Sequence, residues 1–473
     1  MTHPYFSRRT WLPRVGLASV LFSVAAWASD VPEIGRPWTV SDVPRYGAMN
    51  STSDLPLRHV GPLSLAQLSD FALRNNPGTR AAWANAMADR AALPAARALL
   101  QPAVSFNVPL QFDRATVNGA ASATAAASDI THSVAPSLGL VWVLFDFGAR
   151  AAGVESARWQ AVASELIYNR ELQTVVSAVE QAYYGSLGAR QLQAALQISV
   201  QAAQDSLDVV RARRQAGLAT VGDTAQAEAA WSNEKLQLVR AQVAARSAQG
   251  SLANAMGLPV NTALSLADDE TASLASGAQE NALHIDQLLA TARTSRADLV
   301  ALSALVIQGD AQLAAAQAQG RPTLSLSAQV AQSWGAERSS GSTQQLALTL
   351  SVPLFDGGLV RAQTQAARAR VQLLAAQRDQ LLQSVELEVW QSFQNADSAQ
   401  ALIDSAQALL RSATVAEDAA RERYKAGMGS LIELLLAQST TAQARVSNVQ
   451  ARYDARLAVA RLGNAVGARA TSN

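Results

Sequence analysis

The sequence predicts a mainly α-helical chain with a membrane β-barrel, built from a duplicated helix–β-hairpin–helix unit. Three observations predict this fold class. The second half of the chain repeats the first, each half contains a proline-free stretch of about 67 residues, and each half also contains segments in which apolar and polar residues alternate. Aromatic residues make up 5% of the 473 residues and charged residues 16%, a composition that favours long helices over a sheet-rich core.

The first 28 residues are typical of a secretory signal peptide. Basic residues precede an apolar stretch at 15–26 that is too short to span a bilayer, and small residues permit cleavage after Ala28. The pair Arg8-Arg9 leaves a twin-arginine signal open beside an ordinary Sec signal. No run of 18 apolar residues follows, so we expect no transmembrane helix in the mature chain.

The internal repeat predicts how the exported chain is organised. The segment 144–148, Leu-Phe-Asp-Phe-Gly, recurs 210 positions later at 354–358 as Leu-Phe-Asp-Gly-Gly. Upstream of the strands the offset is 220, so that Pro102 matches Pro322. The predicted divisions are an N-terminal periplasmic arm at 29–62, a first repeat at 63–257, a linker at 258–284, a second repeat at 285–467 and a tail at 468–473.

Within each repeat the period of the apolar pattern changes from helical to alternating and back. A helix is expected at 65–100 and at 285–319. The strands follow at about 102–116 and 133–146, then at about 322–333 and 344–356. The proline-free stretches predict helices at 149–215 and 359–425, each roughly 100 Å long at 1.5 Å per residue. Glycine breaks then separate them from returning helices at 221–257 and 430–466.

The alternating segments are also compatible with half-buried strands of a soluble sheet. The signal peptide and the small number of strands beside the helices favour a membrane barrel instead. Four strands cannot close a barrel, because a spanning barrel has no free edge and needs at least about eight strands. Several copies of the chain would supply them, and the long helices would continue as a tube in the periplasm.

The repeat carries two recurring motifs. The first is a Leu-Phe-Asp-x-Gly joint between strand and helix, and the second is an Arg-x-x-x-x-Ala-Gly turn that closes each long helix. In this combination the chain resembles the TolC family of outer-membrane exit ducts. The residues of the two joints that carry the resemblance are Asp146, Gly148, Asp356, Gly357 and Gly358.

The resemblance implies a homotrimer with a 12-stranded barrel, a helical tunnel in the periplasm and an equatorial region that includes 258–284. It also implies partners: outer-membrane lipid, a periplasmic adaptor (membrane fusion) protein, and an inner-membrane pump, either an ABC or a proton-driven transporter. In the family the exposed turns at the tunnel tip meet the adaptor. The corresponding residues here are Gly217, Leu218, Gly427 and Met428.

Acidic residues follow each tip turn, at Asp223 and Glu433. One reading is that they only cap helices, because acids in a first turn complement the helix dipole. The resemblance implies instead an acidic ring at the tunnel entrance. Tyr424 stands where the family has a latch tyrosine. The latch otherwise departs from the best-known relatives, since Gly429 stands where they have an arginine and Leu436 where they have a second acid.

Composition excludes several function classes. The absence of cysteine excludes disulfides, thiolate metal sites, a catalytic thiol and a lipidated N-terminus. The net charge of +1 and the lack of a basic stripe argue against nucleic acid as a partner. The four histidines are scattered without metal-ligand spacing, at His3, His59, His132 and His284. No catalytic constellation, metal site or cofactor motif is present, so we do not expect an enzyme.

The predicted function is a passive channel of the outer membrane, the exit duct of a tripartite efflux or type I secretion system, gated at its periplasmic tip by adaptor contact. One alternative is a pore-free coiled-coil spacer or filament of the cell envelope, and another is an exported hydrolase. The cargo stays open between drugs, metal ions and a protein toxin. The missing lipid-anchor cysteine favours the secretion branch of the family, to which the cyclolysin-type members belong.

Overall fold

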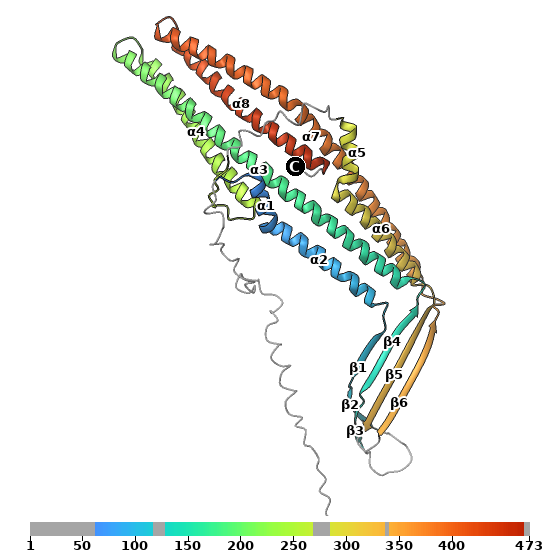
Figure 1. Cartoon of the computed structure of the whole chain (residues 1–473). Coiled ribbons are helices and arrows are strands. Elements are labelled where there is room, and N and C mark those ends of the chain that lie inside the picture. Colours follow the sequence, from blue (N-terminus) through green and yellow to red (C-terminus); the bar gives the residue numbers. More distant parts are fainter. Residues whose placement is uncertain (1–61, 117–127, 268–283, 336–339, 468–473) are drawn as a thin grey trace, which may run out of the picture. The chain divides into compact units, whose positions relative to one another are not determined.

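The computed structural model describes residues 62–116, 128–267, 284–335 and 340–467, all within one compact unit, Gly61–Asn473. The signal peptide, the predicted arm up to residue 61, part of the linker and the C-terminal tail lie outside the described residues, as do His3 and His59. Figure 1 shows helices running in pairs and a small sheet at one end of them.

Eight helices are described, four in each repeat. The two long ones, α3 (Ala149–Gln215) and α7 (Leu359–Lys425), occupy the ranges of the two proline-free stretches. The returning helices are α4 (Val221–Ala255) and α8 (Leu431–Val466). The shorter helices that precede the strands are α1 (Leu65–Asn75), α2 (Pro77–Ala98), α5 (Ile285–Ser295) and α6 (Ala297–Ala318).

The prediction of one helix before each hairpin, at 65–100 and 285–319, is wrong, because each range holds two helices. In the first repeat Pro77 begins α2 and keeps Asn76 extended, with ψ of 130°. In the second repeat no proline is present, yet Arg296 is extended in the same way, with ψ of 114°. The contacts that hold Arg296 there are described below.

The helices of each repeat pack along its long helix. α2 and α4 follow one another along α3, and α6 and α8 follow one another along α7 (Figure 1). Since α3 also packs against α6 and α8, the two repeats share one interface. The buried positions of α3 include many small residues, which let neighbouring helices approach closely: Ala161, Ala163, Ser164, Ser177, Ser186, Ser199, Ala203 and Ser206.

α6 has the length and hydropathy that a membrane-spanning helix needs, and in the described part of the chain it is the one helix that does. It packs against both α3 and α7, so its apolar residues have helical neighbours on two sides. The described start of the linker runs beside Leu63, which forms a parallel bridge with Leu266. The Tyr183 hydroxyl, on α3, donates to the carbonyl of Ala267, 2.9 Å away.

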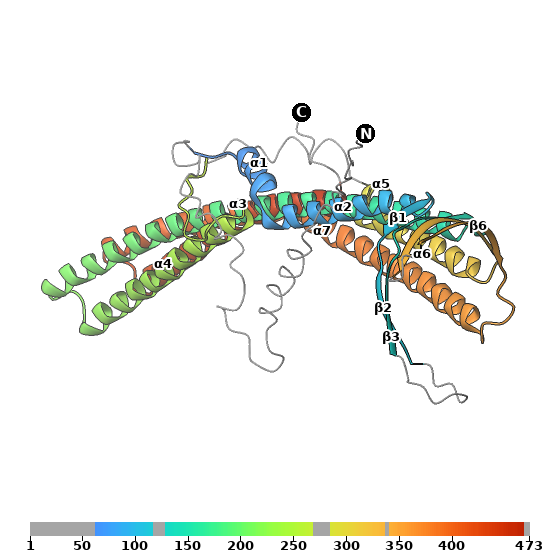
Figure 2. The same cartoon turned by 90° about the horizontal axis from the view of Figure 1, so that it is seen from below.

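The strands form a single antiparallel sheet, visible from below in Figure 2, in which β4 and β5 join the two hairpins. In the described chain the strands are β1 (Ala103–Asn107), β2 (Leu110–Thr116), β3 (Ser128–Val134), β4 (Ser137–Phe145), β5 (Thr323–Gly335) and β6 (Ser340–Ser351). β1 pairs with β4, β2 with β3, and β6 with β5, so β1 and β2 lie on one edge of the sheet and β6 on the other.

Three prolines explain where the strands differ from the predicted ranges. Pro109 and Pro136 divide each strand of the first hairpin in two, because proline has no amide hydrogen for the ladder. The register continues unchanged across this interruption, from Asn107 opposite Ser137 to Leu110 opposite Val134. β6 ends at Ser351 instead of 356, just before Pro353, so Val352 and Leu354 lie beyond the ladder.

The apolar residues of the sheet are exposed in the single chain. They alternate along the two edges of the sheet, and each is at least half exposed: Val104 and Phe106 on β1, Leu110 and Phe112 on β2, and Leu346, Leu348 and Leu350 on β6. Among the described residues, no strand pairs with the outer edge of β1 or of β6. An apolar face and two open edges of this length require a covering surface, and membrane lipid and further strands would supply it.

Candidate functional site

The ends of the two helix hairpins are built alike. After α3 the backbone turns at Gly217 with φ of +75°, and after α7 it turns at Gly427 with φ of +77°. In each turn two amides bond back to carbonyls of the last helical residues, such as Leu218 N–H to Arg213 at 2.8 Å. This Schellman arrangement needs a left-handed residue, which explains the glycine at both positions. Leu218 and Met428, next to these glycines, are largely exposed.

The two acids after the turns differ in what they bind. The Asp223 carboxylate accepts both the amide and the hydroxyl hydrogen of Thr220, each at 2.8 Å, which completes a capping box at the start of α4. These two hydrogen bonds lower the pKa of Asp223 below its ordinary value. Asp223 therefore has the capping role that was one of its two readings, and it stays ionised at neutral pH.

The carboxylate of Glu433, in contrast, does not cap the start of its helix. Its main-chain amide donates to Ser430 Oγ at 3.2 Å, whereas its side chain points to Arg423 across the turn, 3.7 Å away. Both side chains are more than half exposed. An exposed pair of this kind is weak, so the Glu433 carboxylate is available to the surroundings of the tip.

Tyr424 lies where the two helix hairpins meet. Its side chain is only 6% exposed. The guanidinium of Arg213, on α3, stacks over the Tyr424 ring with its central carbon 4.6 Å from the ring centre. The same guanidinium donates to the Tyr424 main-chain carbonyl at 2.7 Å. One residue of the first hairpin thus holds both the ring and the backbone at the end of the second hairpin.

An apolar cluster surrounds this contact. We call it the tip cluster, and its buried members are Leu207, Val210, Ala227, Tyr424, Leu431 and Leu434. It takes residues from all four helices α3, α4, α7 and α8. The tip cluster and the Arg213 contact together hold the two hairpins side by side. The position of Gly429 is tight, since a Cβ there would lie 3.2 Å from the Tyr424 nitrogen and from Arg423 Cβ.

The two strand-to-helix joints are helix caps. Asp146 accepts the amides of Gly148 and Arg150, and Asp356 accepts those of Gly358 and Val360. The glycines Gly148, Gly357 and Gly358 have positive φ between +66° and +91°. The joints therefore turn the chain from the sheet into each long helix, and the structure gives these capping residues no further chemistry.

The first joint is reinforced and the second is not. Arg150 binds Asp146 at 2.7 Å and also donates to the carbonyls of Leu99 and Val143. These bonds connect α3 to the end of α2 and to β4. At the equivalent place in the second repeat stands Val360, which has no group that could make such bonds.

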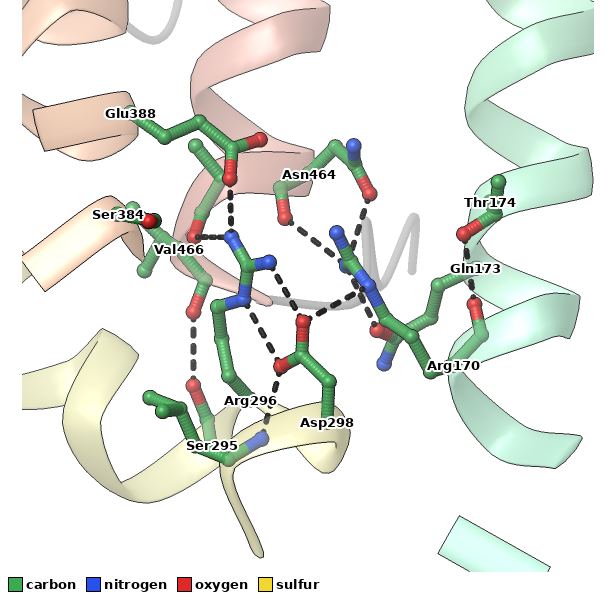
Figure 3. Close-up of polar contacts among 12 residues, drawn as sticks. Arg170, Gln173, Thr174, Ser295, Arg296, Asp298, Ser384, Glu388, Asn464 and Val466 are labelled. Atoms are coloured by element: carbon green, nitrogen blue, oxygen red, sulfur yellow. Dashed lines mark hydrogen bonds and ion pairs between the residues drawn. The ribbon is translucent and has the colours of Figure 1, made fainter. Parts of the chain in front are cut away.

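A charged cluster around the buried Arg296, at the break between α5 and α6, was not predicted from the sequence (Figure 3). Arg296, 3% exposed, binds both oxygens of Asp298, Glu388 on α7 at 2.6 Å, and the carbonyl of Ala465 at the end of α8. Arg170 on α3 binds Asn464 and lies 3.5 Å from Asp298. The cluster joins α3, α6, α7 and α8 at one point.

The repeat offsets contain the signal that could have found this cluster. Arg296 lies 220 positions after Asn76, whose amide donates to the carbonyl of Ala255 at 2.9 Å. Ala255 and Ala465 are themselves 210 positions apart. At each break a side chain thus binds the end of the returning helix. In the first repeat it is the neutral side-chain amide of Asn76, and in the second it is Arg296 with its charged partners.

Among the residues predicted for the gate, Tyr424 contacts Arg213, for which the sequence predicted no role at the gate. In the part of the chain that the structure describes, no three His, Cys, Asp or Glu side chains are grouped to hold a metal ion. At this site the two hairpins contact each other through Arg213, Tyr424 and the tip cluster, and exposed residues lie beyond this contact at the turns.

Comparisons with known proteins match the whole repeated region. A sequence model of the family described as Outer membrane efflux protein matches residues 68–258 and 288–468, once in each repeat. The chain is 29% identical over 398 residues to Protein CyaE of Bordetella pertussis, covering 83% of this chain and 82% of that protein. It is 24% identical over 412 residues to Outer membrane protein TolC of Escherichia coli, covering 83% and 79%.

Solved structures share the fold. The outer membrane protein VceC of Vibrio cholerae matches with a TM-score of 0.73 and 21% identity, over 85% of this chain and 96% of that chain. The CmeC outer membrane channel of Campylobacter jejuni matches with a TM-score of 0.75 and 18% identity, over 85% of each chain.

Proposed function

Because the chain belongs to the outer membrane efflux protein family, we propose that three copies of it assemble into the exit duct of a tripartite efflux or type I secretion system. The family consists of transport channels of the outer membrane, and this chain is one of them. The resemblance to the TolC family that the joints and turns predicted is confirmed. The alternative of a pore-free spacer is thereby set aside.

The main support for the proposed assembly is the sheet with its two open edges. When β1 with β2, and β3 with β4, are each counted as one strand interrupted at a proline, the chain supplies four strands, and the edges formed by β1 and β2 and by β6 have no outer neighbour among the described residues. In the proposed duct, β6 of one copy pairs with β1 and β2 of the next, and 12 such strands close a barrel whose exposed apolar residues face lipid. The long helices then continue as a tunnel of the same three copies.

We place the gate at the hairpin ends. The Arg213–Tyr424 contact and the tip cluster hold the two hairpins of each copy together, which narrows the tunnel entrance at rest. Opening requires the hairpins to part. A periplasmic adaptor that binds the exposed turns around Gly217, Leu218, Gly427 and Met428 would favour the parted state.

Energy for transport would come from an inner-membrane ABC or proton-driven pump, linked through the adaptor. The duct itself is passive. It provides a path for the cargo and a gate that opens when the adaptor binds. Gating therefore rests on the difference in free energy between the closed and the parted hairpins.

The acidic ring is testable by ion selectivity. In the trimer, Asp223 and Glu433 would place six carboxylates at the entrance, and such a ring raises the local concentration of cations. Asp223→Asn combined with Glu433→Gln keeps the hydrogen-bond acceptors and removes the charges. We expect the ratio of cation to anion permeability in planar bilayers to fall by roughly two- to tenfold.

The matched control is Asp70→Asn, which removes an exposed charge on α1. It should leave the permeability ratio as in the parent protein. An unchanged ratio in the double variant would exclude these two residues as the ring.

A further inference from the structure

The first strand-to-helix joint, between β4 and α3, carries two aromatic rings that point outward. Phe145 and Phe147 are 54% and 41% exposed, although Asp146 between them is buried. The two rings meet edge to face, with their centres 4.7 Å apart. Phe147 has φ of +50° and is, in the described part of the chain, the one residue other than glycine with a positive φ.

This backbone conformation is unfavourable for a phenylalanine. In the left-handed region a Cβ lies too close to the following carbonyl oxygen, so the position favours glycine. At the second joint the equivalent residue, 210 positions later, is Gly357, with φ of +66°. Because glycine makes the same turn there, the turn does not need the ring of Phe147. A ring that is kept at a backbone cost indicates a function.

A β-bulge brings Phe145 to the apolar face of the sheet. Trp142 of β4 lies on this face, opposite Leu326 of β5. The register then shifts, and Phe145 lies opposite Leu324. Leu324 and Leu326 share a face because they are two positions apart on one strand, and directly opposed residues of two strands also share a face. Phe145 therefore joins Trp142 on the apolar face, where regular alternation would have turned it away.

Arg321 completes a group with the two rings. It stands between α6 and β5, is exposed, and holds the central carbon of its guanidinium 5.9 Å from the centre of the Phe147 ring. This guanidinium has no ion-pair or hydrogen-bond partner in the part of the chain that the structure describes. The acid of the joint, Asp146, is bound to Arg150 at 2.7 Å. The charge of Arg321 is therefore free at the edge of the apolar face.

The second joint lacks this group. Phe355, the equivalent of Phe145, is 92% exposed. Gly357 replaces Phe147, and the offset of 220 places Gln101 where the first joint has Arg321. The combination of rings and arginine thus occurs once in each copy, and the second joint shows which residues the fold accepts without it.

The first joint lies where the sheet meets the helices (Figure 1). In the proposed duct this level is the boundary between the outer membrane and the periplasm. Aromatic rings are favoured at such a boundary, where acyl chains meet the headgroups. The headgroups carry phosphodiesters, and the planar guanidinium of arginine binds phosphate through two parallel hydrogen bonds.

We propose that Phe145, Phe147 and Arg321 bind one phospholipid of the membrane leaflet that faces the periplasm, with Arg321 on the phosphate and the two rings beside the acyl chains. The site favours an anionic headgroup over a zwitterionic one, because Asp146 is already bound and no free carboxylate of the joint offsets the charge of Arg321. This inference rests on the proposed duct, which turns the apolar face to lipid. It adds a lipid site to that duct.

Lipid binding to the purified trimer tests the site. The trimer in detergent is titrated with phosphatidylglycerol, and native mass spectrometry counts the lipid molecules that stay bound. We expect the parent protein to bind one phosphatidylglycerol per copy first, and to bind phosphatidylcholine more weakly. Arg321→Gln introduces the residue that the second repeat offset pairs with it, and should weaken phosphatidylglycerol binding about tenfold, because the charge-assisted hydrogen bonds to phosphate are lost.

Arg361→Gln is the matched control. Arg361 is an exposed arginine in the first turn of α7, beside the second joint, so the same charge is removed at the same end of the helices. Its affinity for phosphatidylglycerol should equal that of the parent. An equal loss in both variants would mean that positive charge attracts lipid without a defined site, and would contradict the proposal.

Phe147→Gly separates lipid binding from a purely structural role of the ring. It should weaken phosphatidylglycerol binding several-fold. The resistance of the trimer to heat in lipid-free detergent should not fall, because glycine accepts this backbone conformation. Lower heat resistance with the parent's lipid affinity would show that the ring only supports the fold, and would contradict the site.

Two further outcomes decide the proposal. Inorganic phosphate at millimolar concentration should not displace the bound lipid, and displacement would show a site for the phosphate group alone. Parent-like affinity of Arg321→Gln would contradict the lipid site and leave the duct standing, because trimer formation is read separately on gels. A parent protein that forms no trimer would contradict the duct, and with it the lipid site.

Discussion

Replacing Arg296 with methionine is expected to lower the free energy of unfolding by about 2–3 kcal/mol, because it removes the charge-assisted hydrogen bonds of a buried guanidinium whose two carboxylate partners are partly exposed. The guanidinium, 3% exposed, binds Asp298, Glu388 and the carbonyl of Ala465. Methionine keeps an unbranched apolar stem but leaves the Asp298 carboxylate, 22% exposed, with Arg170 as its ion-pair partner, at 3.5 Å. The contact of α8 with the α5–α6 break is lost at the same time.

Arg293→Met is the matched control, three residues earlier. Arg293 also pairs with a glutamate of α7, Glu386, at 2.7 Å, but the two side chains are 54% and 33% exposed. Its removal should change the free energy of unfolding by less than about 1 kcal/mol. Urea titration of the detergent-solubilised protein measures both variants, and equal losses would contradict a special role of the buried cluster.

The cluster also has an expected pH dependence. Burial raises the pKa of Asp298, but hydrogen bonds and charge from Arg296, with the charge of Arg170, outweigh burial, and the net pKa lies below the ordinary value. A carboxyl group with a lowered folded pKa stabilises the protein above its unfolded pKa, about 3.9. This stabilisation is lost as the pH falls below that value through the folded pKa. The Arg296→Met protein should show less of this acid-dependent loss.

Removing the Arg213 guanidinium is expected to open the gate. Arg213→Ala removes a stacking contact over Tyr424 and a charge-assisted hydrogen bond to its carbonyl. Together these are worth about 2 kcal/mol in a half-buried setting, or roughly 30-fold in the ratio of parted to closed hairpins in each copy. Because three copies act on one entrance, the conductance of single channels in planar bilayers should rise several-fold.

Arg214→Ala is the control for this experiment, since Arg214 is the exposed neighbour at the end of the same helix. It removes the same charge from the tip without touching Tyr424. A similar rise in both variants would mean that tip charge sets the conductance. No rise in either would contradict the latch.

The long helices were predictable because their signals are local. Absence of proline gives α3 and α7 their length, and the glycines at 217 and 427 supply the left-handed residue that each turn needs. The divided strands of the first hairpin were within reach of the same reasoning, since Pro109 and Pro136 mark where the ladder is interrupted. The two readings of Asp223 could not be separated by sequence, because a capping acid and a ring acid occupy the same helical position.

The break at Arg296 and the contact of Arg213 with Tyr424 were not predictable. No proline or glycine marks the break, and the extended conformation of Arg296 depends on partners 92 and 169 positions away. Arg213 and Tyr424 are 211 positions apart and meet only because α3 packs against α8. Such contacts form only when complete hairpins dock, and no local sequence pattern predicts them.

Closure of the sheet by neighbouring copies is the central requirement of the duct, and the repeat fixes its register. The pair Ala103–Val141 in the first hairpin corresponds to Thr323–Ser351 in the second, at offsets of 220 and 210. Within the chain, β4 pairs with β5 so that Leu138 lies opposite Val330. The same offsets place Leu348 of β6 opposite Leu110 of the next copy.

Cysteine cross-linking tests that register directly, because the chain contains no cysteine. Leu348 and Leu110 are 64% and 66% exposed in the single chain. Oxidation of the Leu348→Cys, Leu110→Cys protein in outer membranes should give a covalent ladder that ends at the trimer on non-reducing gels, since directly opposed side chains are close enough for a disulfide. Leu348→Cys with Gln111→Cys should not cross-link, because a shift of one residue turns the side chain to the other face. Equal cross-linking of both pairs, or none by the first, would contradict the duct.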